Sequence, residues 1–249
     1  MKISVILLLL LSALISVGGD FTPLDSLKKE KAVKASNLKV MTRFHSMGQF
    51  SYGGRIVSPN PTLDFNLNYD RKNWGLQIFK AIDLRDRNTQ INFTLAVVNK
   101  NFRLGKRLSV TTSAGFILEQ SRTIADHGSD VVLVVSTIYR LSKVFTLDYT
   151  TLFGNLVLEP DARDWVNRFR LQYSKKHIDV MLTGWHNNKV FDTAEYITCG
   201  VSAFYSRVKI SNTVSMNAGA TLLIMPYSND TEVYPKRNGL IFTLGMVID

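Results

Sequence analysis

Two arginines, Arg168 and Arg170, are the residues whose type and spacing point most directly to chemistry. They lie two positions apart in segment 165–174, which has the pattern of a strand, so their side chains project from one face. The forked donors of a guanidinium bind carboxylates and phosphates, so the pair could attract or bind anions. Alternatively, the pair forms salt bridges with Asp64 or Asp148, because a charge inside a narrow interior needs a partner. The sequence leaves both interpretations open.

Catalytic chemistry has weaker support in the sequence. Among the four histidines, His127 follows Asp126 in a long loop and His186 precedes Asn187 near the end of a strand. A catalytic histidine must be oriented by a partner, and no spacing here selects one trio over another. The GxSxG, HExxH, P-loop and dinucleotide-binding motifs are absent, and a single cysteine, Cys199, excludes CxxC metal or redox sites. We therefore expect no catalytic residue, no metal and no cofactor.

Short segments of alternating polar and apolar residues must position these side chains. In segment 62–70, TLDFNLNYD, apolar and polar residues alternate strictly, which gives a strand one apolar and one polar face. Twelve candidate strands follow one another: 39–51, 62–70, 73–82, 90–99, 107–118, 131–140, 143–153, 165–174, 177–186, 196–206, 213–224 and 239–248. The sequence thus predicts one all-β domain, an antiparallel up-and-down β-barrel of about twelve strands.

The polar faces of these strands are predicted to face inward. The predicted pore-lining residues are Asp64, Asn66, Asn68, Asn92, Asp148, Arg168, Arg170 and Gln172. Arg43 and His45 on the first strand are candidates to extend the same basic strip. Three bulky residues also fall on predicted inward positions and suggest the alternative of a filled, sealed interior: Ile117, Leu152 and Phe204.

The beginning of the chain has the features of an export signal. In residues 1–19, Lys2 precedes an apolar run over 3–15 and small residues follow, so we interpret this segment as a cleaved signal peptide. Residues 20–38 carry no strand pattern and are predicted to be a periplasmic N-terminal segment, either a solvated tail or, alternatively, a small plug or partner-binding element. Residues 39–249 are the predicted barrel.

The connections between the predicted strands alternate in length and in charge. The short connections carry twelve basic residues against one acidic residue, Asp70, whereas the longer ones carry twelve acidic and eight basic residues. Membrane barrels have short periplasmic turns and longer extracellular loops. The net charge of +10 would ordinarily suggest a nucleic-acid partner. The export signal and the absence of nucleic-acid-binding motifs argue against one.

The chain has an export signal, strands of alternating polar and apolar residues, and connections of two classes that differ in length and charge. In these features it resembles the outer-membrane β-barrels of Gram-negative envelopes over residues 39–249. The resemblance implies a transmembrane barrel in the cell outer membrane, with membrane lipid and the barrel-assembly machinery as partners. Many such barrels end in an aromatic residue that the assembly machinery reads. This chain departs from that pattern, since its nearest aromatic residue is Phe242.

The expected function is that of a porin-like channel for passive diffusion of small polar or anionic solutes. One alternative is a sealed barrel that serves as a structural protein or as a surface receptor through loops 119–130 and 226–239. A soluble secreted carrier of the lipocalin type and a barrel enzyme are less favoured. A soluble carrier would require the apolar strand faces to point inward.

Overall fold

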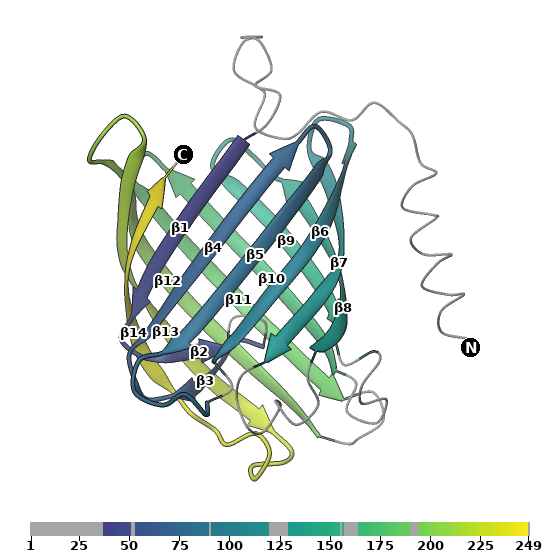
Figure 1. Cartoon of the computed structure of the whole chain (residues 1–249), viewed down its shortest axis with the longest axis vertical. Coiled ribbons are helices and arrows are strands. Elements are labelled where there is room, and N and C mark those ends of the chain that lie inside the picture. The colour runs from purple at the N-terminus through teal and green to yellow at the C-terminus, as the bar shows by residue number, and fades with distance from the viewer. Residues whose placement is uncertain are drawn as a thin grey trace, which may run out of the picture.

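The computed structural model describes residues 37–50, 53–89, 91–119, 129–154, 156, 164–189 and 194–248. Twelve antiparallel strands form a closed barrel, and two shorter strands form a separate hairpin (Figure 1). The barrel strands are β1 (Asn37–His45), β4 (Thr62–Arg71), β5 (Trp74–Asp83), β6 (Phe93–Leu104), β7 (Leu108–Glu119), β8 (Ser129–Arg140), β9 (Phe145–Phe153), β10 (Asp164–Lys175), β11 (Ile178–Lys189), β12 (Glu195–Lys209), β13 (Val214–Ser228) and β14 (Gly239–Ile248). The hairpin consists of β2 (Gly48–Phe50) and β3 (Arg55–Ser58).

Barrel strands that follow one another in the chain pair with one another, and β14 pairs with β1 to close the ring. In that closure Val40 lies opposite Ile248 on one side and opposite Leu67 of β4 on the other. The prediction of an all-β, antiparallel up-and-down barrel of about twelve strands is confirmed. The predicted signal peptide and nearly all of segment 20–38 lie outside the described residues.

The outer surface of the barrel is apolar. On β14, Leu240, Phe242 and Leu244 are 49–59% exposed, whereas the alternate residues Ile241 and Thr243 are buried. Exposed large hydrophobic side chains occur in the same way on every strand of the ring. A continuous apolar band of this kind suits a bilayer and not water, and it is the reverse of what a soluble carrier requires. Among the described residues, no helix is long and apolar enough to cross a membrane.

The two ends of the barrel differ, as the connection lengths predict. Tight turns join the strands at one end, where the start of β1 and the C-terminus also lie (Figure 1). Lys72, Lys176 and Arg207 adopt positive φ at this end, and so does Gly105. Longer connections, such as 84–92 and 229–238, lie at the opposite end. We refer to the two ends as the turn end and the loop end.

The structure corrects the prediction of a first strand over 39–51. β1 ends at His45, and the chain then turns into the β2–β3 hairpin, which lies across the loop end of the barrel (Figure 1). Gly48 permits the close pairing of β2 with β3, because a Cβ on it would lie 2.9 Å from the Cβ of Ser58, its partner in the hairpin. Alternation alone did not separate β1 from β2, since both segments favour extended backbone.

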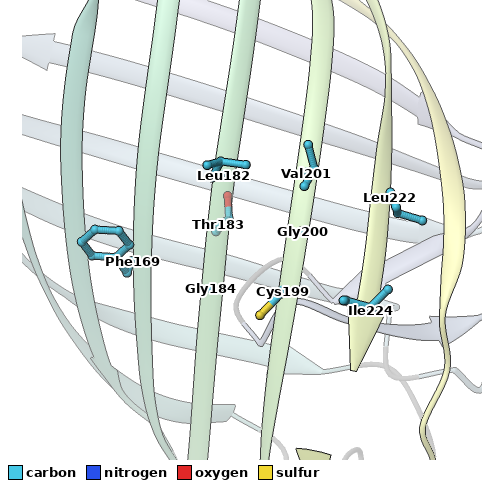
Figure 2. Close-up of a pocket in the computed structure, with 9 residues that line it drawn as sticks. All are labelled: Phe169, Leu182, Thr183, Gly184, Cys199, Gly200, Val201, Leu222 and Ile224. Carbon is cyan, nitrogen blue, oxygen red and sulfur yellow. The ribbon is translucent and has the colours of Figure 1, made fainter. Parts of the chain in front are cut away.

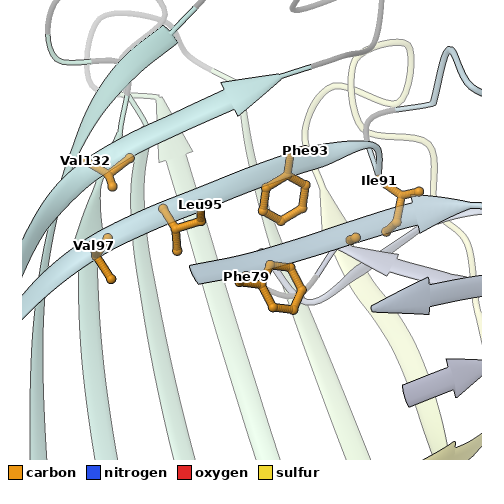
Figure 3. Packing of buried hydrophobic residues seen from close by; sticks show 7 residues of the cluster. Phe79, Ile91, Phe93, Leu95, Val97 and Val132 are labelled. Carbon is orange, nitrogen blue, oxygen red and sulfur yellow. The ribbon is translucent and has the colours of Figure 1, made fainter. Parts of the chain in front are cut away.

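The inward face of the barrel is apolar near the loop end. Phe79, Phe93, Leu95 and Val132 are each at most 3% exposed and pack together (Figure 3). The faces predicted for the loop-end half of β6 were therefore inverted, since Phe93, Leu95 and Val97 point inward and Thr94 points outward. Farther along the strand, Val98 is 50% exposed on the outer surface and Asn99 lines the cavity. The apolar hairpin explains this inversion, because it gives the inward face at this end an apolar neighbour in place of water.

Candidate functional site

A cavity of about 440 Å³ occupies the interior of the barrel. Its lining comes from eight barrel strands, from β1 and β4 on one side to β9 and β10 on the other. The polar and charged side chains that line it are Arg43, Asn66, Gln77, Asn99, Thr111, Ser113, Ser136, Asp148, Thr150, Arg168 and Arg170. The cavity inside the barrel can therefore hold water.

A first ion cluster lies where the barrel closes. Arg43 of β1 donates to both carboxylate oxygens of Asp64 of β4, from Nε at 3.0 Å and from Nη2 at 2.8 Å. His45 places its Nε2 3.0 Å from the same carboxylate and its Nδ1 2.8 Å from the hydroxyl of Thr243 on β14. This cluster therefore joins three strands across the seam between the first and last strands. Gly245 leaves it room, because a Cβ there would lie 3.1 Å from Cγ of Arg43.

A second ion cluster lies on the opposite side of the ring, on β9 and β10. Arg170 donates to Asp148 at 2.6 Å, and Arg168 lies 3.4 Å from the same carboxylate and donates to Thr150 at 3.0 Å. Asp148 is 4% exposed, while the two arginine side chains are 27–31% exposed. Each guanidinium can therefore pair with Asp148 and still reach the water of the cavity.

The two clusters together give the cavity a basic balance. Three arginines (Arg43, Arg168 and Arg170) face two aspartates (Asp64 and Asp148), which leaves one positive charge when His45 is neutral. A low-dielectric wall strengthens such a charge relative to bulk water. The salt-bridge interpretation of the arginine pair is confirmed for Asp148. The anion-binding interpretation stays a prediction, and the exposure of both arginines to the cavity is compatible with it.

The other predicted pore-lining residues are distributed along the barrel. Asn66 lines the cavity. Asp64 is not part of the cavity lining, but it binds Arg43, which is. Asn68 and Gln172 occupy inward positions nearer the turn end, where Gln172 donates to Ser174.

Asn92 does not lie on a strand or line the cavity. It precedes β6, is 4% exposed, and accepts a hydrogen bond from the backbone N–H of Asp83. Its amide also donates to the carbonyl of Asp86, so its contacts order the β5–β6 connection. The prediction that placed Asn92 on an inward strand face failed because strand boundaries read from alternation are uncertain by a few residues.

The contacts of His45 resemble those of a catalytic triad, with a hydroxyl on one nitrogen and a carboxylate on the other. Here Asp64 is already bound by Arg43 in two places, and Thr243 lies within the β13–β14 ladder. Strand amides in such a ladder are used in pairing, so they do not form an oxyanion site beside the hydroxyl. The arrangement fits a structural role at the seam. The described residues also contain no group of three metal-ligating side chains suited to an ion.

Sequence reasoning missed the contacts that hold the hairpin at the loop end. The guanidinium carbon of Arg55 lies 5.1 Å from the ring centre of Tyr234 and 5.8 Å from that of Tyr196. The two tyrosine rings meet edge to face at 4.6 Å, and the hydroxyl of Tyr196 donates to the carbonyl of Gly53 at 3.0 Å. The signal available in the sequence was the glycine pair Gly53–Gly54, which is typical of a tight turn.

A second hollow, of about 310 Å³, lies on the outer surface over β10 to β13 and is separate from the lumen. Figure 2 shows that it surrounds Gly184, which leaves a notch between Phe169, Leu182 and Ile224. Its lining is almost wholly apolar, and it lies within the apolar outer band of the barrel. Lipid acyl chains can therefore fill it.

No protein-family model and no curated protein matches the chain in sequence. Solved structures do match in fold. The "KdgM porin" has a TM-score of 0.56 at 10% identity, covering 85% of this chain and 98% of that one. The "NanC porin" has a TM-score of 0.54 at 11% identity, covering 86% of this chain and 100% of that one. At this identity the likeness shows a shared barrel fold.

Proposed function

We propose that this protein is an outer-membrane channel for the passive diffusion of small polar or anionic solutes. The observation that carries the proposal is a closed barrel with an apolar exterior and a polar interior cavity of about 440 Å³. The two structural relatives are both described as porins, which supports the same proposal.

The mechanism is diffusion through a lumen whose walls carry the two ion clusters on opposite sides. An anionic solute can replace part of its hydration shell with hydrogen bonds from Arg43, Arg168 or Arg170. It therefore crosses the lumen with a lower free-energy barrier than a cation does. Asp64 and Asp148 hold these arginines in place and offset most of their charge. The predicted selectivity is therefore a moderate preference for anions.

The test is single-channel recording in a planar bilayer with a salt gradient across it. We expect discrete conductance steps and a reversal potential on the anion side. The double variant Arg168→Ala/Arg170→Ala should move the reversal potential toward cations, because Asp148 then faces the cavity alone. Asn99→Ala is the matched control, since it also lines the cavity but carries no charge. A reversal potential that is equal in all three proteins would remove the arginines from the selectivity mechanism.

A sealed barrel that acts through its loops is the second candidate. The β2–β3 hairpin favours it, because the apolar side chain of Ile56 is buried among inward-facing residues at the loop end. Loop 119–130, one of the two proposed binding loops, lies almost wholly outside the described residues. A correctly inserted barrel that never conducts would favour this alternative.

We further propose that the protein acts without catalysis and that the barrel-assembly machinery inserts it. The buried, doubly bound Asp64 supports the first proposal, and the lipid-facing band supports the second. Depletion of the assembly machinery should lower the amount of heat-modifiable, membrane-inserted barrel. An unchanged amount would contradict that route.

A further inference from the structure

We propose that the β2–β3 hairpin is the plug that limits passage through the lumen, and that solutes pass when it leaves its seat. This inference rests on the proposed channel function and concerns the same lumen. Its starting point is that the hairpin lies across the loop end of the barrel and follows directly from β1 (Figure 1).

The apolar side chains of the hairpin contact inward-facing residues around most of the ring. Ile56 is 4% exposed and belongs to a cluster contributed by β9, β10, β11, β13 and β14: Leu152, Val166, Trp185, Leu223 and Ile241. Val57 packs against the opposite cluster, which β5, β6 and β8 contribute and which includes Phe79 and Leu95. Because these two neighbouring residues contact both sides of the barrel, the hairpin fills the lumen at this level.

The apolar layer formed by these contacts closes one end of the polar cavity. Leu152, Val166, Phe79 and Leu95 belong both to these clusters and to the cavity lining. A hydrated ion that leaves the cavity toward the loop end must therefore cross a layer lined mainly by apolar side chains, which is costly. The position of Ile56 makes the hairpin the element that decides whether this layer is continuous.

The hairpin is not part of the barrel ladder. β2 and β3 pair with each other in a separate sheet, while the twelve barrel strands close into a ring without them. Its polar attachments to the barrel are side-chain hydrogen bonds. Tyr196 Oη and Thr198 Oγ1 donate to the carbonyl of Gly53 at 3.0 and 3.5 Å, Arg237 Nη1 donates to the carbonyl of Val57 at 3.0 Å, and Ser58 Oγ donates to Asp83. The hairpin can therefore leave its seat without breaking a strand pairing of the barrel.

The seated position leaves polar groups of β11 unsatisfied. The indole Nε1 of Trp185 and the amide Oδ1 of Asn187 are buried and have no hydrogen-bond partner within the described part of the chain. Both lie at the hairpin, since a Cβ on Gly54 would meet the Trp185 ring at 2.1 Å and Asn187 lies opposite Tyr196 in the ladder. Water reaches both groups when the hairpin leaves, which lowers the cost of opening.

The first test uses the full chain in planar bilayers, with wild type, a hairpin deletion and a point variant. In the deletion, residues 48–58 are replaced by a short Gly–Ser linker. In Ile56→Asn, the apolar stopper becomes polar, and Val233→Asn, an exposed loop-end residue, is the matched control. We expect the deletion and Ile56→Asn to raise the open fraction about tenfold or more, since burying one isoleucine is worth roughly that factor or more. Val233→Asn should behave as wild type.

The second test locks the hairpin in its seat. Ser58 Oγ donates to Asp83 Oδ2 at 2.5 Å, so Ser58→Cys/Asp83→Cys in a Cys199→Ser background places two thiols at the hairpin's attachment to β5. Oxidation should suppress conductance steps, and reduction should restore them. Asp83→Cys alone is the control for the lost carboxylate. If the fully oxidised Ser58→Cys/Asp83→Cys variant conducts like its reduced form, the proposal that the hairpin plugs the lumen is rejected.

The outcomes separate this inference from the proposed function. If wild type and the hairpin deletion conduct equally, the channel stands and the plug is rejected. If neither conducts although gel mobility shows folded, heat-modifiable barrels, the channel itself is rejected and the plug with it. If the deletion conducts and wild type conducts about tenfold less or not at all, both stand.

Discussion

Asp64 is the residue whose loss should most weaken the closure of the barrel. It is 4% exposed and accepts two hydrogen bonds from Arg43 of β1, while His45 lies 3.0 Å away. It thus joins β4 to β1, and His45 continues the contact to β14 through Thr243. The substitution Asp64→Ala removes the acceptor that these groups share, and it leaves the guanidinium of Arg43 without its bidentate partner.

The size of the effect follows from burial. Removing one partner of a fully buried ion pair costs about 3–5 kcal/mol. The side chain of Arg43 is 30% exposed and reaches the cavity, so water recovers part of that loss. We therefore expect Asp64→Ala to lower the free energy of unfolding by about 2–3 kcal/mol. Asn68→Ala, on the same strand and face, should cost less than about 1 kcal/mol.

The assay is equilibrium unfolding in guanidinium of barrels folded into phospholipid vesicles, followed by tryptophan fluorescence. The double variant Arg43→Met/Asp64→Leu sharpens the test, because replacing both partners by apolar groups avoids a buried unpaired charge. It should recover at least about half of the loss seen in Asp64→Ala. The reasoning is refuted if Asp64→Ala and Asn68→Ala lower stability equally, or if the double variant is less stable than Asp64→Ala.

Two further substitutions test packing on the barrel wall. Gly115→Ala should destabilise the barrel by roughly 1–3 kcal/mol, because its Cβ would lie 1.9 Å from the backbone oxygen of Ala96. Gly184→Ala, whose Cβ meets nothing within 4 Å, should stay within about 0.5 kcal/mol of wild type, and equal losses in the unfolding assay would contradict this account. Trp74→Leu should cost about 1–2 kcal/mol, because Nζ of the buried Lys100 lies 4.4 Å from the indole ring centre. Trp74→Phe keeps an aromatic face and should lose less in the same assay.

Strand alternation determined most of the architecture in advance. Leu240, Phe242 and Leu244 point outward, in agreement with inward polar faces, and each of the twelve predicted segments contains a barrel strand, although the first also runs into β2. This succeeds because the side-chain period of a strand is two, so each residue's face is set by its own position in the strand. The lengths of the connections and their charges also separated the two ends of the barrel, since those properties are local as well.

The pairing within the lumen was only partly predictable. The sequence indicated that Arg168 and Arg170 share a face and that Asp148 was one possible partner, and the structure shows that both reach Asp148. It did not indicate that Arg43 and His45 meet Asp64. Those contacts depend on the closure of the ring, which brings β14, β1 and β4 together.

Tertiary structure alone decided what fills the loop end. The segment after β1 has the same extended pattern as a strand, and only the closed barrel shows that it forms a hairpin seated on Leu152 and Val166. That seat also inverted the expected faces of β6, where Leu95 points into the lumen. The sequence by itself determined the alternating faces of most strands, the difference between the two ends of the barrel, and the excess of basic residues in the short connections. These properties follow from single strands and turns. The plugging of the lumen depends on which side chains meet across the ring, and strand periodicity carries no information about those distances.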